Sequence, residues 1–272
     1  FTHLPRRQQE PNINIPHTAR RSSKMSDGKT INTVLVIIAM EAEAAPFVQH
    51  MQLTKDEPSL LGAPLPAISY SGAHGATKIV VVCNGKDALH GVDSVGTVGA
   101  ALTAFAAIQA VKPDLVINAG TCGGFKAMGG EIGDVYVSSS FKNHDRRIPL
   151  PGFDKFGTYT VEAPECLKLA AALGLKVGVV STGNSLDCTP TDAEVMKANE
   201  ASVKEMEGAA IAQVAQMYGV PIFAIKSVTD IVDGDRTTGE EFMENLGAAA
   251  KALQEKLPKV IEFLAGNTTA CL

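Results

Sequence analysis

The chain has no tryptophan, aromatic residues make up only 5 % of its 272 residues, and positive charge is scarce, with a formal net charge of −5. Nucleic acids recruit clusters of Lys and Arg, so we expect no nucleic-acid partner. The longest apolar runs, such as 34–40 and 79–83, are too short to span a bilayer, which argues against a membrane partner. The five cysteines form no CxxC pair, which argues against a zinc ribbon or a redox dithiol and predicts free thiols in a reducing, cytoplasmic compartment.

The first 24 residues differ in composition from the rest of the chain. They carry five Arg and Lys residues against one acid, Glu10, and show neither a helical nor a strand period. We predict that residues 1–24 are a disordered tail or a leader outside the native fold, such as sequence ahead of a start at Met25. The open alternative is an organelle transit peptide, which would also be basic and poor in acids.

Strands and helices are predicted to alternate along residues 25–272. Apolar, β-branched runs predict strands at 33–39, 67–72, 78–83, 115–119, 134–138, 176–181, 202–206 and 222–228, the second and third forming a hairpin. Helices are expected at 41–51, from about 99 to 110, and at 164–173, 192–199, 207–218 and 239–264, with loops at 58–66 and 141–159. This order predicts an α/β fold, a single domain with a central mixed β-sheet flanked by helices.

Acids, small hydroxyls and glycines follow several of the predicted strands. The stretches are Met40-Glu41-Ala42-Glu43, Gly120-Thr121-Cys122-Gly123-Gly124, Ser181-Thr182-Gly183-Asn184-Ser185, Glu205-Met206-Glu207-Gly208 and Thr229-Asp230. In open α/β sheets ligands bind at the carboxyl ends of strands. We therefore expect these stretches to gather at one edge of the sheet and to form a ligand site there.

Asp230 is a candidate proton donor because it ends a strongly apolar strand. Desolvation raises the pKa of a carboxyl group, and a protonated acid could donate to a leaving group. The alternative is a structural aspartate that caps a helix or begins the turn at Asp233-Gly234-Asp235.

The other acids each have a structural alternative. Glu41 and Glu43 lie in the first turn of a predicted helix, where acids complement the helix dipole, although one of them could act as a general base on water. Glu207 has the same alternative at the start of the next helix, and Glu205 would share its direction if both were on a strand.

Two further stretches carry weaker indications. Gly120–Gly124 could be an anion nest or a tight turn, but no GKS or GKT follows, so it is not a Walker loop. His144-Asp145-Arg146-Arg147 offers too few ligands for a metal, so we expect a loop that gates the pocket or crosses to a partner subunit.

Eight stretches together carry a specific resemblance. They are VIIAMEAEAAP (36–46), GVDSVGTVGA (91–100), KPDLVINAGTCGGF (112–125), IGDVYVSS (132–139), HDRRIP (144–149), STGNSLD (181–187), KEMEGAAIAQVA (204–215) and KSVTDIVDGD (226–235). In these stretches the chain resembles the nucleoside phosphorylase/hydrolase superfamily, and within it the 5′-methylthioadenosine nucleosidases of the plant type. The resemblance covers residues 33 to 265 and implies a catalytic domain of that fold over 25–272.

Applied to this sequence, the resemblance implies that Glu43 activates water, Glu207 binds the ribose and Asp230 protonates adenine at N7. The substrate-binding residues that it implies are Thr121 near the ribose and base, Met206 against the ribose, Leu186 beside the purine and the backbone of Asp187 at the adenine edge, with Glu205 and Lys226 in the same set. No metal or organic cofactor is implied. Two positions depart from the pattern, since Asn184 stands where many relatives have aspartate and Lys226 where bacterial relatives often have arginine.

The activity that the resemblance implies is hydrolysis of 5′-methylthioadenosine to adenine and 5-methylthioribose, with S-adenosylhomocysteine as a possible weaker substrate. It also implies a homodimer, with the helix after Gly96 and the loop 144–149 as candidate interface segments. The nearest alternative is phosphorolysis, but Glu43 would repel phosphate at the attacking side. A non-catalytic relative on the same fold, such as a storage protein, should have lost an acid, whereas Glu43, Glu207 and Asp230 are all present.

Overall fold

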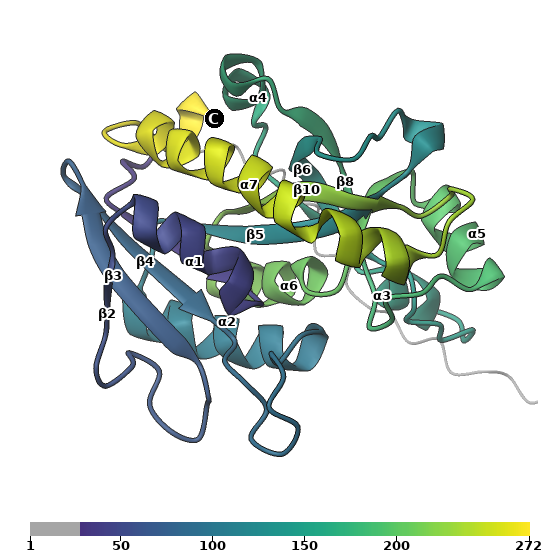
Figure 1. The fold of residues 1–272 in the computed structure, drawn as a ribbon, viewed down its shortest axis with the longest axis horizontal. Helices are drawn as coiled ribbons and strands as arrows, with labels where there is room; N and C mark the ends of the chain where they lie inside the picture. Colours follow the sequence, from purple (N-terminus) through teal and green to yellow (C-terminus); the bar gives the residue numbers. More distant parts are fainter. Residues whose placement is uncertain (1–27) are drawn as a thin grey trace, which may run out of the picture.

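The computed structural model describes residues 28–272 (Figure 1), so the prediction for residues 1–24 lies outside the described residues. The strands are β1 (Thr33–Ile38), β2 (Thr54–Lys55), β3 (Ile68–His74), β4 (Thr77–Cys83), β5 (Leu115–Gly124), β6 (Val135–Asn143), β7 (Val161–Glu162), β8 (Lys176–Thr182), β9 (Ala201–Glu205) and β10 (Ile222–Ile231). The helices are α1 (Glu41–His50), α2 (Thr97–Val111), α3 (Phe153–Thr158), α4 (Leu167–Leu173), α5 (Pro190–Ala198), α6 (Gly208–Tyr218) and α7 (Thr238–Leu264), with short 3₁₀ turns at Lys126–Met128 and Thr269–Cys271.

The strands form one mixed sheet, which confirms the predicted α/β class. The buried strand β1 pairs in parallel with β4 and with β5, and β5 pairs in parallel with β10. The path then runs from β10 through β6, β8 and β9. Because β9 pairs back onto the end of β5, five of the strands close into a ring, where the sequence suggested an open sheet.

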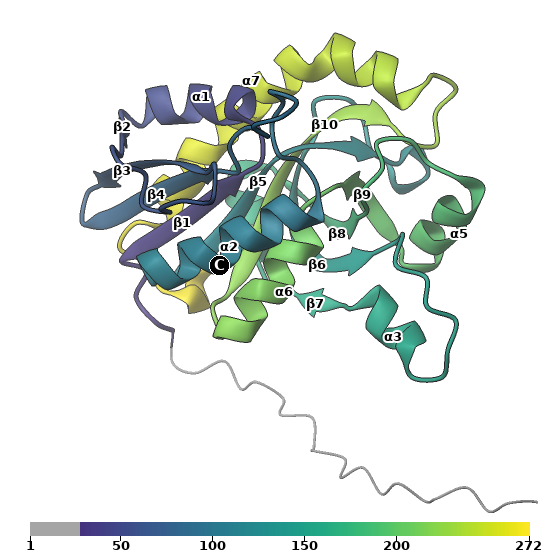
Figure 2. The ribbon, with the colours of Figure 1, turned by 90° about the horizontal axis from the view of Figure 1, so that it is seen from below.

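Helices cover both faces of this sheet. In Figure 2, α1 and α7 lie on one face and α2 and α6 lie side by side on the other. Two apolar clusters fill the interfaces, one containing Phe47 and Leu253 and the other containing Ala104 and Ile211. Each fully buried large aliphatic side chain contributes roughly 1.5–3 kcal/mol, so the two layers fix the positions of the strand ends between them. Within residues 28–272, no helix is both long and apolar enough to cross a membrane.

Three predicted boundaries were wrong, and all three bear on the site. Gly120–Gly124 is the end of β5 and not a loop, because its backbone pairs with β10 on one side and with β9 on the other. The predicted loop 141–159 contains the end of β6 and the helix α3. Finally, β9 stops at Glu205, and Glu207 is the N-cap of α6 rather than part of the helix.

Candidate active site

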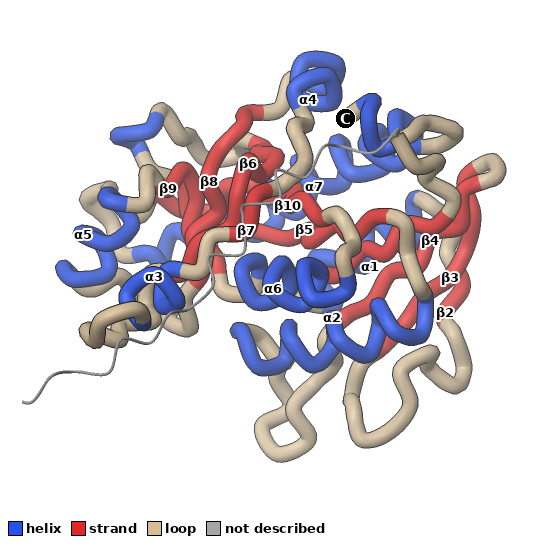
Figure 3. The backbone as a smooth tube through the Cα atoms, turned by 180° about the vertical axis from the view of Figure 1, so that it is seen from behind, coloured by secondary structure: helices blue, strands red, loops and turns tan. Residues whose placement is uncertain are grey.

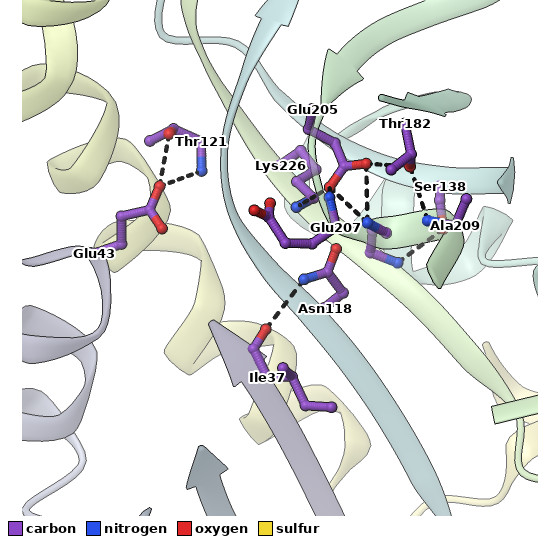
Figure 4. A network of polar contacts seen from close by, with 12 residues as sticks. Ile37, Glu43, Asn118, Thr121, Ser138, Thr182, Glu205, Glu207, Ala209 and Lys226 are labelled. Atoms are coloured by element: carbon purple, nitrogen blue, oxygen red, sulfur yellow. Dashed lines mark hydrogen bonds and ion pairs between the residues drawn. The ribbon is translucent and has the colours of Figure 1, made fainter. Parts of the chain in front are cut away.

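A cavity of about 270 Å³ lies where β5, β9 and β10 end and where α1 and α6 begin. Its walls are formed by Ala39, Met40, Glu43, Val95, Ala119, Gly120, Thr121, Cys122, Gly123, Leu186, Lys204, Glu205, Met206, Glu207, Lys226, Thr229, Asp230, Thr238 and Phe242. Three separated carboxylates, Glu43, Glu207 and Asp230, border the same space, as the strand-end argument predicted. Figure 4 shows Glu43 with Thr121 on one side and the cluster around Glu205 on the other.

Glu43 is held as a hydrogen-bond acceptor at the start of α1. Its side chain is buried, and Oε1 accepts hydrogen bonds from the backbone N of Thr121 at 2.8 Å and from Thr121 Oγ1 at 2.6 Å. Glu41 is directed elsewhere, because its Oε1 accepts from the hydroxyl of Tyr70 on β3 at 3.2 Å. Of the two acids that the sequence left open, only Glu43 borders the cavity.

Glu205 and Lys226 form a fully buried ion pair, with Oε2 and Nζ 2.9 Å apart. The carboxylate of Glu205 also accepts from the hydroxyl of Thr182 and from the backbone N of Glu207 and Gly208. Burial alone would raise the pKa of Glu205, but the Lys226 charge and these hydrogen bonds hold it below its ordinary value. Both residues border the cavity as expected, yet their polar atoms serve each other and the start of α6, which leaves little capacity for a substrate.

The side chain of Glu207 lies beside this pair and makes no hydrogen bond with either member of it. Its Oε1 accepts from the backbone N of Gly96, the N-cap of α2, at 2.8 Å. Burial and the neighbouring charge of Glu205 raise its pKa to about 7, against the opposing effect of Lys226. The sequence left open that Glu207 only complements the dipole of the helix after it; in the structure the Glu205 carboxylate binds the first N–H groups of α6, and Glu207 Oε2 remains available to the cavity.

Asp230 lies near the end of β10, where the register with β5 is irregular. Its Oδ2 is buried without a hydrogen-bond partner among the described residues, and burial raises its pKa above the ordinary value. Its Oδ1 lies 2.6 Å from Thr229 Oγ1, which is also 3.1 Å from the carbonyl oxygen of Cys122. The hydroxyl of Thr229 donates to Asp230 Oδ1, and this hydrogen bond opposes the effect of burial on the pKa of Asp230.

The close approach of Asp230 to the sheet depends on a glycine. A Cβ atom at Gly123 would lie 2.6 Å from Asp230 Oδ2, so any side chain at this position would displace the carboxyl group. Glycine at this position therefore provides room for the acid, and the anion nest that the sequence suggested is not formed.

The sequence analysis missed Lys204, which borders the cavity from β9. Its side chain is buried, and Nζ donates to the carbonyl oxygens of Ser185 at 2.7 Å and Leu186 at 2.9 Å. A lysine inside a strand whose five residues are all buried is unusual. The burial of this strand is seen only in the structure. Thr238 and Phe242 of α7 also border the cavity, and no sequence pattern had singled them out.

The remaining predicted residues are divided between the cavity and its surroundings. Leu186 and Met206 border the cavity, whereas Asp187 lines an adjoining depression that also touches Leu186. His144 is buried with Nδ1 3.0 Å from Ser181 Oγ, and burial lowers its pKa. Among residues 28–272, no group of three or more His, Cys, Asp or Glu side chains is arranged to hold a metal ion.

Comparison with known proteins agrees with this geometry. The family model described as phosphorylase superfamily matches residues 33–262. A 5′-methylthioadenosine nucleosidase of Arabidopsis thaliana is 48 % identical over 244 residues, covering 90 % of this chain and 91 % of the relative. A 5′-methylthioadenosine/S-adenosylhomocysteine nucleosidase of the same plant is also 48 % identical, over 88 % of this chain and 94 % of the relative.

Solved structures give the same result for the fold. The apo structure of the Arabidopsis thaliana 5′-methylthioadenosine nucleosidase has a TM-score of 0.88 at 48 % identity, covering 90 % of this chain and all of the other. The fold and the matched length define an α/β protein of nucleoside phosphorylase type. The chain belongs to the phosphorylase superfamily, and the relatives that it matches at 48 % identity are nucleosidases.

Proposed function

We propose that this protein hydrolyses the N-glycosidic bond of 5′-methylthioadenosine, releasing adenine and 5-methylthioribose. The observation that carries the proposal is one small cavity bordered by Glu43, Glu207 and Asp230, three carboxylates that are not paired with a cation, of which Asp230 has an unpartnered buried oxygen among the described residues. The two Arabidopsis relatives bear nucleosidase names and match nearly the whole chain, which supports the same activity here.

Asp230 is the proton donor. Adenine is a poor leaving group until it is protonated, and burial raises the pKa of Asp230, which favours the protonated acid. The proton passes to adenine N7 as the bond between N9 and C1′ breaks and its electrons move onto the base.

Glu43 activates the water that replaces adenine. Thr121 fixes one carboxylate oxygen with two hydrogen bonds, and the other oxygen can then take a proton from water. Water adds to C1′ on the face opposite the base as the sugar passes through an oxocarbenium-like state. The water oxygen bonds to C1′, one water proton goes to Glu43 and the other stays on the new hydroxyl group of 5-methylthioribose, so no further reactant is needed.

Glu207 and Met206 bind the sugar. Glu207 accepts a hydrogen bond from a ribose hydroxyl and stabilises the positive charge that develops nearby, while the Met206 side chain packs on the ribose. Leu186 packs beside the purine, and the backbone at Asp187 meets its edge. The Glu205–Lys226 pair holds the backbone of Glu207 in place, because Glu205 accepts a hydrogen bond from the backbone N of Glu207.

The cavity wall also favours an apolar 5′ group. The apolar residues Val95, Met40 and Phe242 also border the cavity. A methylthio group fits such a wall without loss of hydration, whereas the charged homocysteine tail does not. S-adenosylhomocysteine is therefore the weaker substrate.

Adenine release measured from both nucleosides in phosphate-free buffer, with the full chain, tests the activity. We expect release from 5′-methylthioadenosine, slower release from S-adenosylhomocysteine, and no acceleration by added phosphate. Of the two lysines that line the cavity, Lys226 is paired with Glu205, and Lys204 is held by the carbonyl oxygens of Ser185 and Leu186, so neither ammonium group is free of protein partners. Release that requires phosphate would overturn the water mechanism and favour phosphorolysis.

The proposal includes a homodimer in the cytoplasm. Five apolar side chains of α2 and α6 are exposed on one surface, here named the α2–α6 face: Val98, Leu102, Phe105, Met217 and Tyr218. Figure 3 shows the two helices side by side in front of the sheet. A contiguous apolar surface of this kind is typical of a subunit interface. The five free cysteines suit a reducing compartment, which imaging of a tagged full-length chain would test.

A further inference from the structure

Lys204 is a buried cation for which the proposed reaction has no use. Its side chain is 5 % exposed, it borders the cavity, and burial lowers its pKa. The other cavity lysine, Lys226, is neutralised by a direct ion pair with Glu205, whereas Lys204 makes no such pair within residues 28–272. Burying an ammonium group is unfavourable unless hydrogen bonds or an opposite charge compensate for the lost hydration. The hydrogen bonds of Lys204 therefore indicate which part of the structure it stabilises.

Those contacts all go to one segment of backbone. The Nζ donates to the carbonyl oxygens of two successive residues, Ser185 and Leu186. The segment is fastened at its start by Gly183, whose N donates to the carbonyl oxygen of Glu205, and by Asn184, whose N donates to Asp145. In the described part of the chain, the backbone of Ser185 and Leu186 has no other hydrogen bond, and Leu186 is 44 % exposed. Lys204 is thus the main polar attachment of this wall of the cavity.

The strand register also places Lys204 next to the proton donor. Lys204 of β9 is opposite Gly123 of β5, and Gly123 is opposite Asp230 of β10. Residues opposite each other on neighbouring strands point to the same face. Since Gly123 has no side chain, the Asp230 carboxyl group occupies the space above it, and the charge of Lys204 acts on this carboxyl group from the next strand.

We propose that Lys204 is a positioning residue of the active site: it fixes the Ser185–Leu186 backbone as the wall on which the purine is bound and sets a positive charge beside Asp230. The inference rests on the proposed function for the identity of the base. The same ammonium stabilises the Asp230 carboxylate that remains after proton transfer, so wall and acid are set by one side chain.

The sign of the electrostatic effect follows from the groups around the two residues. Lys204 is surrounded by Asp230, Asp187, Glu205, Cys188 and His144, and Asp230 additionally faces Glu241 and the hydroxyl of Thr229. Two groups lower the pKa of Asp230, the Thr229 hydroxyl and the Lys204 charge, and removing the Lys204 charge leaves only the first to oppose burial and Glu241, so the pKa rises. A reaction that needs protonated Asp230 then continues to higher pH, so its alkaline limb moves upward.

Three substitutions separate the two effects. Lys204→Met removes both the donors and the charge, Lys204→Gln keeps an N–H donor without the charge, and Lys204→Arg keeps both. Lys197→Met, at an exposed lysine on α5, is the matched control. Three quantities are measured on the full chain: the Kd of adenine, the rate of thermolysin cleavage at the Ser185–Leu186 bond, and the alkaline limb of kcat/KM.

We expect Lys204→Met to weaken adenine binding at least tenfold, to speed the cleavage at least tenfold and to move the alkaline limb to higher pH. Lys204→Gln should restore part of the adenine affinity with the limb still moved, and Lys204→Arg should return the limb to the wild-type position. Lys204→Met behaving like Lys197→Met in all three measurements would overturn the proposal, as would faster cleavage with unchanged adenine affinity. If the Met variant does not fold, the Gln and Arg variants carry the same comparison.

Failure of this inference and failure of the proposed function give different results. A wild-type chain that releases no adenine from 5′-methylthioadenosine would refute the hydrolase activity, whereas adenine affinity and loop cleavage would still report on Lys204.

Discussion

Asp230 and Glu43 border the same cavity but differ in their hydrogen-bond partners. Glu43 accepts two hydrogen bonds from Thr121, whereas Asp230 leaves an oxygen buried without a partner among residues 28–272, and burial raises the pKa of Asp230. These different surroundings support the roles proposed for the two carboxylates, base for Glu43 and acid for Asp230.

Replacing the acid by its amide tests this assignment. Asp230→Asn should lower kcat for adenine release by roughly 10²–10⁴-fold, since the amide cannot donate a full proton, while the melting temperature stays near that of the wild type. Asp235→Asn, at an exposed aspartate five residues further along, is the control and should be fully active. A near-normal rate in Asp230→Asn would show that the proton comes from elsewhere.

Glu207 links activity to stability through pH. Its pKa is about 7 in the folded chain against an ordinary value of 4.5, so its contribution to stability is lost as pH rises from about 4.5 to about 7. Glu207→Gln should therefore unfold less readily than the wild type at pH 8, by on the order of 3 kcal/mol, with most of the difference gone at pH 5. Urea titrations at the two pH values measure this.

The matched control for that experiment is Glu194→Gln, at an exposed acid on α5, which should show the same stability as the wild type at both pH values. In Glu207→Gln the new amide oxygen can still accept from the backbone N of Gly96, so the packing is preserved, but adenine release should fall sharply. Equal stability of Glu207→Gln and the wild type at pH 8 would mean that burial does not destabilise the ionised Glu207.

At the scale of elements, the site depends on how β5, β9 and β10 end together. The last residues of β5 pair with strands on both sides, which draws Lys204 and Asp230 to either side of Gly123. The turn from β9 into α6 then separates Glu205, which caps the helix, from Glu207, which faces the cavity. A one-residue shift at this junction would disturb the placement of both acids.

Gly123→Ala should disturb this arrangement directly. The new methyl group would lie 2.6 Å from both Asp230 Oδ2 and Val232 Cγ2, so we expect a loss of about 1–3 kcal/mol in stability and a larger fractional loss of adenine release. Calorimetry and the release assay measure the two effects.

Gly247→Ala is the control for the element-scale change. This glycine lies inside α7 with no atom within 4 Å of a Cβ, so alanine should stabilise the helix by roughly 0.5–1 kcal/mol and leave activity unchanged. Full activity in Gly123→Ala would show that Asp230 does not need its observed position.

At the scale of the whole molecule, the exposed apolar surface lies beside the cavity entrance. Val95 borders the cavity, and Thr97 and Val98 at the start of α2 border a groove that continues over α6. The N-terminal end of α2 therefore belongs both to the α2–α6 face and to the surroundings of the cavity. At this end the backbone N of Gly96 donates a hydrogen bond to Glu207. A second copy on this face would order that helix end.

Leu102→Glu places a charge on the α2–α6 face and should convert the proposed dimer to a monomer, as measured by light scattering after gel filtration. Leu167→Glu is the control, since this leucine is similarly exposed but lies on α4. A dimer that survives Leu102→Glu would exclude this face as the interface.

The sequence determined the alternation of strands and helices and the kinds of residue at the strand ends. Local periodicity and β-branched runs fix these features, so β1, β4, β8 and the long α7 were found within a few residues. Glu43, Glu207 and Asp230 were identified as candidates for the same reason, supported by the resemblance of the stretches around them.

Tertiary structure decided the division of work among those residues. Both Glu205 and Glu207 border the cavity, and where β9 stops decides that the Glu205 carboxylate binds the start of α6. The attachment of Lys204 depends on a segment that precedes it by some twenty residues in the chain. The glycine stretch became a strand because β9 and β10 pair with both of its sides, which no local pattern records. Burial, pKa and hydrogen-bond partners are properties of the packed strand ends, and they exist only once distant segments have met.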